Sequence, residues 1–465
     1  MRLFLFVSGL MLAASGAFAQ TAIDWTAVQA ESLKYYVDLI RIDTSSPPGN
    51  ETRAAKYLQA VLEKEGIEAK LVGPTPDRMS LIARLKGSGA KRPIAIFGHL
   101  DVVGVQKERW SEDPFGGKLI DGFVWGRGSV DDKDNVVASL MTILLLKRTH
   151  ATLDRDVIFV AEADEEAAGR EGILYLVREH WPDLDAEYCL AEGGGFVSRG
   201  GKLTHQNIQL AEKRVQTMRL VTQGAAGHGS QPRPDNAIVR LSNAVAKLAA
   251  WQPPMRLNDI TRAYFEKLAL VSSPEDAARF NGLTNPAKTA AIQEYFRQHD
   301  IFHNSVLRTT ISPNIIQGGF RSNVIPSEAT ATLDIRALPD EDMEKFKAQM
   351  AKVIGDPEVK IESSGIQNLP APAGSMNTEL YRVLESVQKR MFPGTVTLPM
   401  MQTGGTDMGA LRRKGVACYG VGIERPVEDA TLHAAHSDNE RGKVSGLHNF
   451  VRYQYEVVAE ISRKK

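Results

Sequence analysis

Phe97-Gly98-His99-Leu100-Asp101 is the stretch that decides the fold, and the apolar residues 93–97 lead directly into it. A short run this rich in Ile predicts a buried strand. Side chains two residues apart on a strand share a face, so His99 and Asp101 are expected on the same side of it. A carboxylate beside a histidine is a common way to orient a metal-binding ring. The pair therefore predicts a functional site at a strand end, with an ordinary hydrogen-bonded histidine as the alternative.

Strands and helices alternate on both sides of this stretch. The hydrophobic spacing predicts helices at 25–42, 51–65 and 135–146 and strands at 80–85 and 156–161. Such alternation is typical of a layered α/β domain. We therefore predict a catalytic domain with a mixed sheet flanked by helices.

The pattern changes near residue 213. Residues 216–222 and 329–335 alternate like half-exposed strands, and residues 236–250 and 341–354 have helical spacing. This order predicts helices on one face of a small, mainly antiparallel sheet, which is an α+β, ferredoxin-like arrangement. The predicted domains are 20–212 and 366–465 for the two parts of the catalytic domain and 213–365 for an inserted lid or dimerisation domain.

Composition and charge exclude some functions. The chain has 465 residues with equal numbers of basic and acidic side chains, 56 of each, so its formal net charge is zero. That balance gives no reason to expect a nucleic-acid partner or a stable membrane partner. The length allows two or three domains.

The N-terminal residues have the features of an export signal. Arg2 precedes the apolar residues 3–14, and Ala17-Phe18-Ala19 offers a small-residue cleavage site. We predict a signal peptide over 1–19, cut after Ala19, and a periplasmic or secreted protein. An uncleaved signal anchor is the alternative.

The chain has two cysteines, Cys189 and Cys418. They either form one disulfide bridge or remain two buried free thiols.

Carboxylates and histidines recur where predicted strands end. The set consists of His99, Asp101, Asp131, Glu165, Glu166, Glu192 and His436. In an open α/β sheet, ligands bind beyond the carboxyl ends of the strands, so these groups are expected in one crevice. Carboxylates at this density repel one another unless a cation neutralises them. Two histidines and several carboxylates suit zinc, and two ions that share a carboxylate suit hydrolysis.

These motifs resemble the di-zinc metallopeptidase family of aminoacylases, carboxypeptidase G, dipeptidases and succinyl-diaminopimelate desuccinylase. The resemblance is carried by His99-x-Asp101, Gly126-Arg127-Gly128-Ser129-x-Asp131-x-Lys133, Asp164-Glu165-Glu166, Glu192, Gly227-His228 and His436-x-x-Asn439-Glu440. It covers nearly all of the mature chain and looks closest to the carboxypeptidase and N-acyl-amino-acid hydrolase branch. It implies a zinc-exopeptidase-like catalytic domain with a lid.

The resemblance also implies a metal site. His99 and Glu192 would bind one zinc ion, Glu166 and His436 would bind the other, and Asp131 would bridge both. Cobalt or manganese would be candidate replacements. In the family, the peptide bond after the residue at Asp131 is typically cis.

Catalytic roles follow from the same resemblance. Glu165 would be the general base that takes a proton from the attacking water and passes it to the leaving amine. Asp101 would orient His99. His228 would stabilise the developing oxyanion, and in dimeric members of the family it reaches the active site of the partner. A plain loop histidine is the alternative for His228.

Substrate contacts are implied at a second group of positions. These are Asn323, Arg336, Gly404, Gly405 and Thr406. Arg336 would clamp a free carboxylate by a two-pronged hydrogen bond. The alternative for Arg336 is a surface ion pair with Asp340.

Together these features predict an exported di-zinc metallohydrolase. It would act as a metallocarboxypeptidase or dipeptidase that cleaves the amide next to a free carboxylate in short peptides or N-acyl amino acids. The alternatives are an aminoacylase-type amidohydrolase and a non-catalytic binding protein on the same fold. We expect a homodimer, because strands such as residues 216–222 would leave an edge that another chain could pair with. The long segment 252–303 would favour a monomer if it covered that edge.

Overall fold

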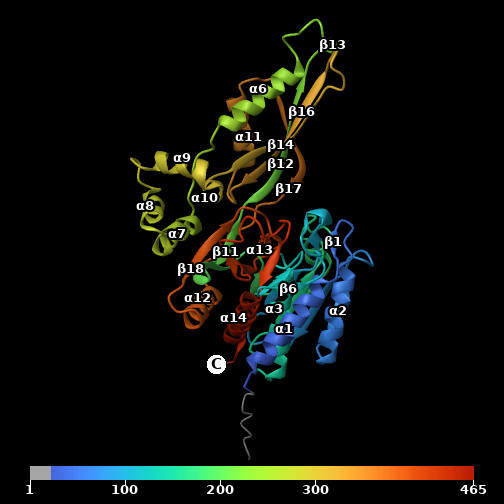
Figure 1. Cartoon of the computed structure of the whole chain (residues 1–465), viewed down its shortest axis with the longest axis vertical. Helices are drawn as coiled ribbons and strands as arrows, with labels where there is room; N and C mark the ends of the chain where they lie inside the picture. The colour runs from blue at the N-terminus through green and yellow to red at the C-terminus, as the bar shows by residue number, and fades with distance from the viewer. Residues whose placement is uncertain (1–21, 465) are drawn as a thin grey trace, which may run out of the picture.

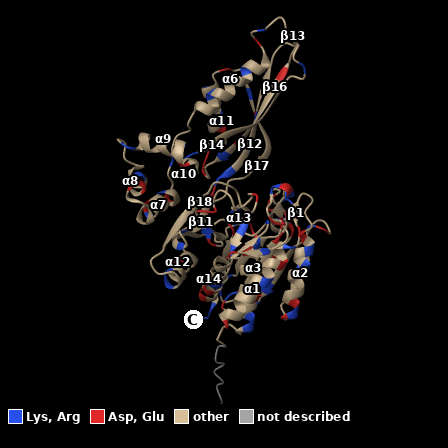
Figure 2. Ribbon diagram, in the orientation of Figure 1, with Lys and Arg blue, Asp and Glu red and all other residues tan. Residues whose placement is uncertain are grey.

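The structure is a computed structural model that describes residues 22–464. The predicted signal peptide lies outside the described residues. Figure 1 shows a larger lower domain that contains both chain ends of the described part and an elongated upper domain that projects from it. Basic and acidic side chains are interspersed over both domains (Figure 2), in keeping with the zero net charge.

The lower, catalytic domain is built on a ten-stranded mixed sheet. Its strands, in spatial order, are β2 (Ala69–Val72), β3 (Ser80–Leu85), β8 (Val157–Glu162), β4 (Ile94–His99), β9 (Tyr188–Ala191), β19 (Ala417–Gly420), β11 (Lys202–Glu212), β10 (Gly195–Arg199) and β20 (Arg425–Pro426), and β18 (Val396–Gln402) pairs with β11. The three central strands β8, β4 and β9 are parallel. Their carboxyl ends therefore meet at one edge of the sheet.

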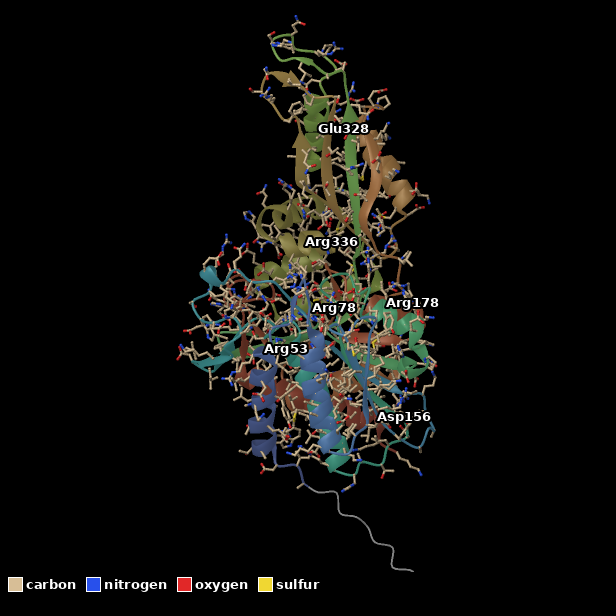
Figure 3. The ribbon with its side chains drawn as sticks, turned by 90° about the vertical axis from the view of Figure 1, so that its right-hand side faces the viewer. Arg53, Arg78, Asp156, Arg178, Glu328 and Arg336 are labelled. Carbon is tan, nitrogen blue, oxygen red and sulfur yellow. A yellow bond between two sulfur atoms is a disulfide. The ribbon has the colours of Figure 1, made fainter. Side chains whose placement is uncertain are left out.

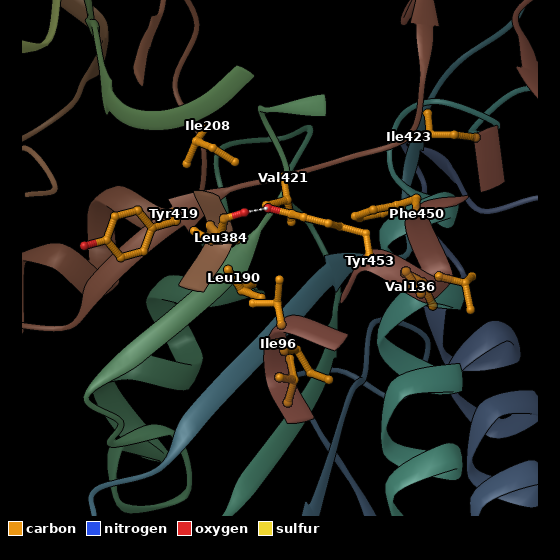
Figure 4. Packing of buried hydrophobic residues seen from close by; sticks show 14 of the residues in the cluster. Ile96, Val136, Leu190, Ile208, Leu384, Tyr419, Val421, Ile423, Phe450 and Tyr453 are labelled. Atoms are coloured by element: carbon orange, nitrogen blue, oxygen red, sulfur yellow. Dashed lines mark hydrogen bonds between the residues drawn. The ribbon is translucent and has the colours of Figure 1, made fainter. Parts of the chain in front are cut away.

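Helices cover both faces of this sheet. They are α1 (Trp25–Ile40), α2 (Glu51–Lys64), α3 (Lys133–Arg148), α4 (Ile173–Glu179), α5 (Trp181–Leu184), α12 (Glu379–Met391), α13 (Met408–Arg413) and α14 (Val444–Ser462). On β4, Ile96 packs into the core formed with α3 and α14, whereas Phe97 packs into the core formed with α4 and α13. Figure 4 shows the first core, with Val136 of α3 beside Phe450 of α14. The predicted α/β sheet is confirmed.

The upper domain has a four-stranded antiparallel sheet in the order β14-β16-β12-β17. Its strands are β14 (Thr310–Gly318), β16 (Glu328–Ala337), β12 (Arg214–Gln223) and β17 (Lys360–Gln367), and its helices are α6 (Ala237–Ala250) and α11 (Met343–Ile354). Both helices pack on one face of the sheet through a shared apolar core. The short pair β13 (Gly227–His228) and β15 (Val324–Ile325) lies at the end farthest from the catalytic domain (Figure 1).

The long segment 252–303 is mostly helical. It contains α7 (Asp259–Leu268), α8 (Pro274–Gly282), α9 (Thr289–His299) and α10 (Ile301–Val306), with η2 (Ala269–Val271). Its core is aromatic, with Phe265 beside Phe280 and Phe296. Lys267 of α7 forms a 2.9 Å ion pair with Glu385 of α12, which ties the segment to the catalytic domain. The expected free edge at 216–222 is wrong, because β12 pairs with β16 on one side and with β17 on the other. The edge strand is β14, and its residues 312–318 are exposed.

The two cysteines are joined. Cys189 and Cys418 are register partners on the parallel strands β9 and β19, and they form a buried disulfide. The bridge links the two sequence-distant parts of the catalytic domain.

The remaining short elements are β1 (Ser45–Ser46), β5 (Val102–Val103), η1 (Lys107–Arg109), β6 (Lys118–Ile120), β7 (Phe123–Trp125) and β21 (Arg441–Lys443). Among the described residues, none of the helices has the length and apolar character needed to cross a membrane.

Candidate metal centre

The predicted ligands come from neighbouring strand ends and two loops. β4 ends at His99, Glu166 follows β8, and Glu192 follows β9. Asp131 lies two residues before the start of α3, and His436 lies in the loop that precedes β21. Because β8, β4 and β9 are adjacent and parallel, the first three side chains are delivered to the same edge of the sheet.

Five side chains form two groups that share Asp131. His99, Asp131 and Glu192 form one group, and Asp131, Glu166 and His436 form the other, with the ligand atoms of each group within 4.8 Å of one another. His99 Nε2 lies 2.9 Å from Asp131 Oδ1. His436 Nε2 lies 3.2 Å from the other oxygen, Asp131 Oδ2. The structure therefore brings together the whole predicted set around one shared carboxylate, while metal binding by these residues stays a prediction. The Asp131–Asp132 peptide bond is cis.

Asp101 contacts His99, as predicted, but more closely through its backbone than through its carboxylate. His99 Nδ1 lies 2.9 Å from the backbone carbonyl oxygen of Asp101, whereas the nearest carboxylate oxygen is 3.6 Å away. The carboxylate instead accepts hydrogen bonds from the backbone N–H groups of Glu165 and Glu166, both at 3.1 Å. Those two amides need an acceptor because a buried N–H without one is costly. Asp101 thus orients His99 through its main chain and holds the acidic pair through its side chain.

The electrostatics of the site fit divalent cations. Burial raises the pKa of Asp101 to about 7 and that of Glu192 to about 8. Burial and the Glu192 carboxylate raise the pKa of Glu165 well above its usual value. Hydrogen bonds to Asp131 and Glu166 raise the pKa of His436 to about 10. His99 and His436 lower the pKa of the shared Asp131, but they do not offset the burial of the surrounding carboxylates. Two divalent ions on this nitrogen-and-oxygen ligand set would supply further positive charge.

A buried ion pair supports the loop that carries Asp131. Glu440 accepts hydrogen bonds from the Arg127 guanidinium and, at 2.8 Å, from the backbone N–H of Val130. The guanidinium also lies over the ring of Trp110, at 5.3 Å from its centre. Arg127 and Glu440 belong to the motifs that carry the family resemblance, and here they fix the residue just before the shared ligand.

A cavity of about 590 Å³ opens beside these groups. The predicted substrate contacts Arg336, Gly404, Gly405 and Thr406 line it, together with Asp131, Glu165, Glu166, Glu192 and His436. Thr406 Oγ1 donates to the Glu212 carboxylate at 2.6 Å, which anchors the glycine-rich loop. Glu212 was missed in the sequence because no motif surrounds it.

Arg336 is paired, but not with Asp340. Its Nε and Nη2 donate to the two carboxylate oxygens of Asp334, at 2.8 and 3.1 Å. The remaining nitrogen, Nη1, has no partner within residues 22–464. Asp334 therefore orients the guanidinium at the cavity wall and leaves one end of it free for a ligand.

His228 and Asn323 do not line the cavity of their own chain. Both are exposed, and they lie at the β13–β15 end of the upper domain, which points away from the catalytic domain (Figure 1). His228 Nδ1 is 2.7 Å from the hydroxyl of Ser230. In this arrangement of the two domains, neither residue reaches the metal centre of its own chain. His433 is also outside the ligand groups, since its Nδ1 lies 2.8 Å from the carbonyl oxygen of Asn439.

A mixed sheet with two carboxylate–histidine groups at the carboxyl ends of its strands, and a glutamate beside them, defines a metal-dependent hydrolase. Residues 95–460 match the profile of Peptidase family M20/M25/M40. The chain belongs to this family, whose members related to it are hydrolytic enzymes.

Two curated relatives resemble most of the chain. It is 27% identical over 390 residues to "Probable carboxypeptidase S-like 2" of Dictyostelium discoideum, covering 82% of this chain and 74% of that protein. It is 25% identical over 441 residues to human "N-fatty-acyl-amino acid synthase/hydrolase PM20D1", covering 92% of this chain and 86% of that protein.

Two solved structures show the same fold. The M20 family metallo-carboxypeptidase Sso-CP2 from Sulfolobus solfataricus has a TM-score of 0.69 and 19% identity, and the match covers 92% of this chain and 98% of that one. The Bacillus subtilis YXEP protein, described as a dinuclear metal binding peptidase, has a TM-score of 0.62 and 16% identity, with 94% and 99% covered.

Proposed function

We propose that the protein is a zinc-dependent hydrolase of N-acyl amino acids that have a free carboxylate and an apolar acyl group. The observation that carries this proposal is one cavity lined by Glu165, Arg336 and four of the five candidate metal ligands, which are Asp131, Glu166, Glu192 and His436. The sequence favoured short peptides as substrates first. The lining of the cavity now favours the acyl amino acid, and dipeptides become the second candidate.

The cavity joins basic and apolar walls. Arg336 would bind the substrate carboxylate, because a guanidinium pairs strongly with that group. Three partly exposed apolar residues, Leu174, Ile366 and Leu369, also line the cavity, and their exposures are 39%, 41% and 65%. Covering such apolar side chains with an apolar acyl group removes their surface from water, which favours binding. The PM20D1 relative, named as a hydrolase of N-fatty-acyl amino acids, is consistent with this choice.

The chemistry would be hydrolysis of the amide bond. His99, Asp131, Glu166, Glu192 and His436 would hold the metal ions, which when bound polarise a carbonyl and lower the pKa of water. Glu165 would accept the proton of the attacking water and return it to the leaving nitrogen. The Asp101 carboxylate keeps Glu165 in place through its backbone amide, 3.1 Å away.

A panel of substrates tests this function. With zinc present, we expect faster release of amine from N-acyl amino acids as the acyl chain lengthens, and slow release from the corresponding amides without a carboxylate. Leu174→Glu should raise KM for long acyl chains about tenfold, because a charge replaces an apolar contact, and leave acetyl substrates nearly unchanged. Leu119→Glu is the matched control, since Leu119 is 56% exposed and does not line the cavity. Equal rates for all chain lengths would contradict the proposed acyl preference, and cleavage of dipeptides alone would favour the second candidate.

We further propose that two chains assemble through the upper domain. β14 is an edge strand with Ile315 and Ile316 exposed by 53% and 61%, and Val239 on the neighbouring helix α6 is 55% exposed. An unpaired edge with apolar side chains is suited to pairing with an identical edge. A second copy is the occupant that also explains why His228 lies away from its own metal centre.

Mixing two inactive variants tests whether His228 acts across subunits. Glu165→Gln and His228→Ala homodimers should each be weakly active, whereas an equilibrated equal mixture should regain about a quarter of the parent activity, because half of the dimers contain one intact site. Sedimentation should show a dimer, and activity should be measured before and after subunit exchange. His299→Ala is the control, because His299 is another exposed histidine of the inserted domain, residues 213–365. A proven mixed dimer without recovered activity would contradict action across subunits.

Export remains a proposal, supported by the N-terminal sequence pattern and by the Cys189–Cys418 disulfide. Disulfides persist in oxidising compartments and are rare in the cytosol. Fractionation of the producing cells should place the protein in the periplasm or medium, with a chain that begins at Gln20. A full-length chain recovered from the cytosol would contradict export.

A further inference from the structure

A partly buried arginine outside the recognised motifs connects two distant carboxylates. Arg78 lies just before β3, and its side chain is 14% exposed. Its Nη2 is 2.6 Å from Glu51 Oε1, and its Nη1 is 2.8 Å from Asp164 Oδ1. The Glu51 side chain is fully buried and that of Asp164 is 3% exposed. One guanidinium therefore neutralises two carboxylates that are both cut off from water.

Asp164 directly precedes the acidic pair Glu165-Glu166. Its backbone has a φ of 67°, in the left-handed region. A residue other than glycine adopts this conformation only where its surroundings fix it. The carboxylate of Asp164 accepts a hydrogen bond from the backbone N–H of Glu171 at 2.8 Å, and its carbonyl accepts one from Gly169. These contacts and the Arg78 ion pair together determine the direction in which the chain enters the acidic pair.

The acidic pair is thus held from two sides. Asp101 binds the backbone N–H groups of Glu165 and Glu166, and Arg78 holds the preceding residue. Arg78 is itself fixed by Glu51, the first residue of α2, and by the hydroxyl of Ser46, 3.2 Å from Nη2. The position of the predicted base therefore depends on a helix that contributes no residue to the cavity.

We propose that Arg78 is a positioning residue for the acidic pair, acting through Asp164 to set the geometry of Glu165 and of the candidate ligand Glu166. Arg78 does not line the cavity. The role rests on the assignment of Glu165 as the base, but its effect on metal binding does not depend on which substrate is cleaved.

The test compares Arg78→Ala with a matched arginine on the adjoining strand. Arg84 of β3 forms a 3.0 Å ion pair with Asp156, and its side chain is 22% exposed. Figure 3 shows Asp156 at the far end of the catalytic domain, whereas Arg78 lies near the junction with the upper domain, below Arg336. Arg84→Ala therefore removes a similar ion pair from the same region of sequence without a connection to the metal centre.

We expect Arg78→Ala to lower kcat about 10- to 100-fold with KM changed less than about threefold, as for loss of a residue that supports a metal ligand. Calorimetric titration of the metal-free protein with zinc should show weaker binding of one ion. Methylguanidine at millimolar concentration should restore part of kcat, because the vacated space connects to the partly exposed side of Arg78. Arg84→Ala should change none of these values.

Several outcomes would overturn the proposal. They are equal loss of kcat in both variants, zinc affinity unchanged in Arg78→Ala, or failure of methylguanidine to rescue a folded protein. If Arg78→Ala does not fold, Asp164→Asn carries the test, since asparagine keeps an acceptor for Glu171 N–H but weakens the ion pair. A normal kcat and zinc affinity in Asp164→Asn would then reject the role. Failure of the proposed substrate class would leave the zinc measurements interpretable.

Discussion

Replacing Glu165 with Gln is expected to lower kcat by about 10² to 10⁴, the range typical for loss of one positioned acid/base group. Glutamine keeps the size of the side chain and its amide can still form hydrogen bonds, but it cannot accept the proton of the attacking water. The backbone N–H of residue 165 would still donate to Asp101, so the loop should keep its conformation. The measurement is kcat and KM for the best substrate of the panel, together with bound zinc.

The control for Glu165→Gln is Glu171→Gln, six residues along the same loop. Glu171 does not line the cavity, and its side chain accepts a hydrogen bond from Thr75 at 3.2 Å. This variant should retain nearly the parent kcat. If Glu165→Gln kept more than about a tenth of the parent kcat with full zinc content, Glu165 would not be the general base.

The candidate site was predictable because its residues occupy positions that a strand pattern and short spacings reveal. His99 ends a run of buried residues, and Glu166 and Glu192 follow two further buried strands. A parallel sheet brings such positions together whatever their distance in sequence. His436 could be separated from His433 only by its spacing to Asn439-Glu440, and the structure places His436, not His433, beside Asp131.

Other features depend on tertiary contacts that leave no local pattern. Arg78 and Glu51 are ordinary charged residues in the sequence, and their pairing becomes visible only when β3 and α2 are packed together. The sequence placed Asp101 beside His99 but could not show that its backbone carbonyl, 2.9 Å from the ring, lies closer than its carboxylate, 3.6 Å away. The bounds of the short helices from 259 to 306 were not predicted, although Asn258 and Ser273 cap two of them.

Replacing Asp131 with Asn is expected to abolish activity and to reduce bound zinc. Asp131 is the one residue common to both candidate ligand groups in the described structure. An amide keeps the shape but has no negative charge and offers a single ligand oxygen, so it cannot bridge two cations as a carboxylate does. The loss in kcat should exceed the factor of about 10² to 10³ that one oxyanion-stabilising group supplies. The measurements are metal content after dialysis and kcat at saturating zinc.

Asp134→Asn separates the loss of a ligand from the loss of a buried carboxylate. Asp134 lies three residues along in α3, is fully buried and accepts a hydrogen bond from the backbone N–H of Ile423 at 3.1 Å. It belongs to neither ligand group, and asparagine can still accept that bond. We therefore expect Asp134→Asn to bind zinc like the parent, even if it unfolds more readily. A ligand shared by two ions couples the loss of one ion to the loss of the other, so Asp131→Asn should lose more zinc than Asp134→Asn. Parent-like zinc content in Asp131→Asn, or an equal loss of zinc in both variants, would contradict a bridging role.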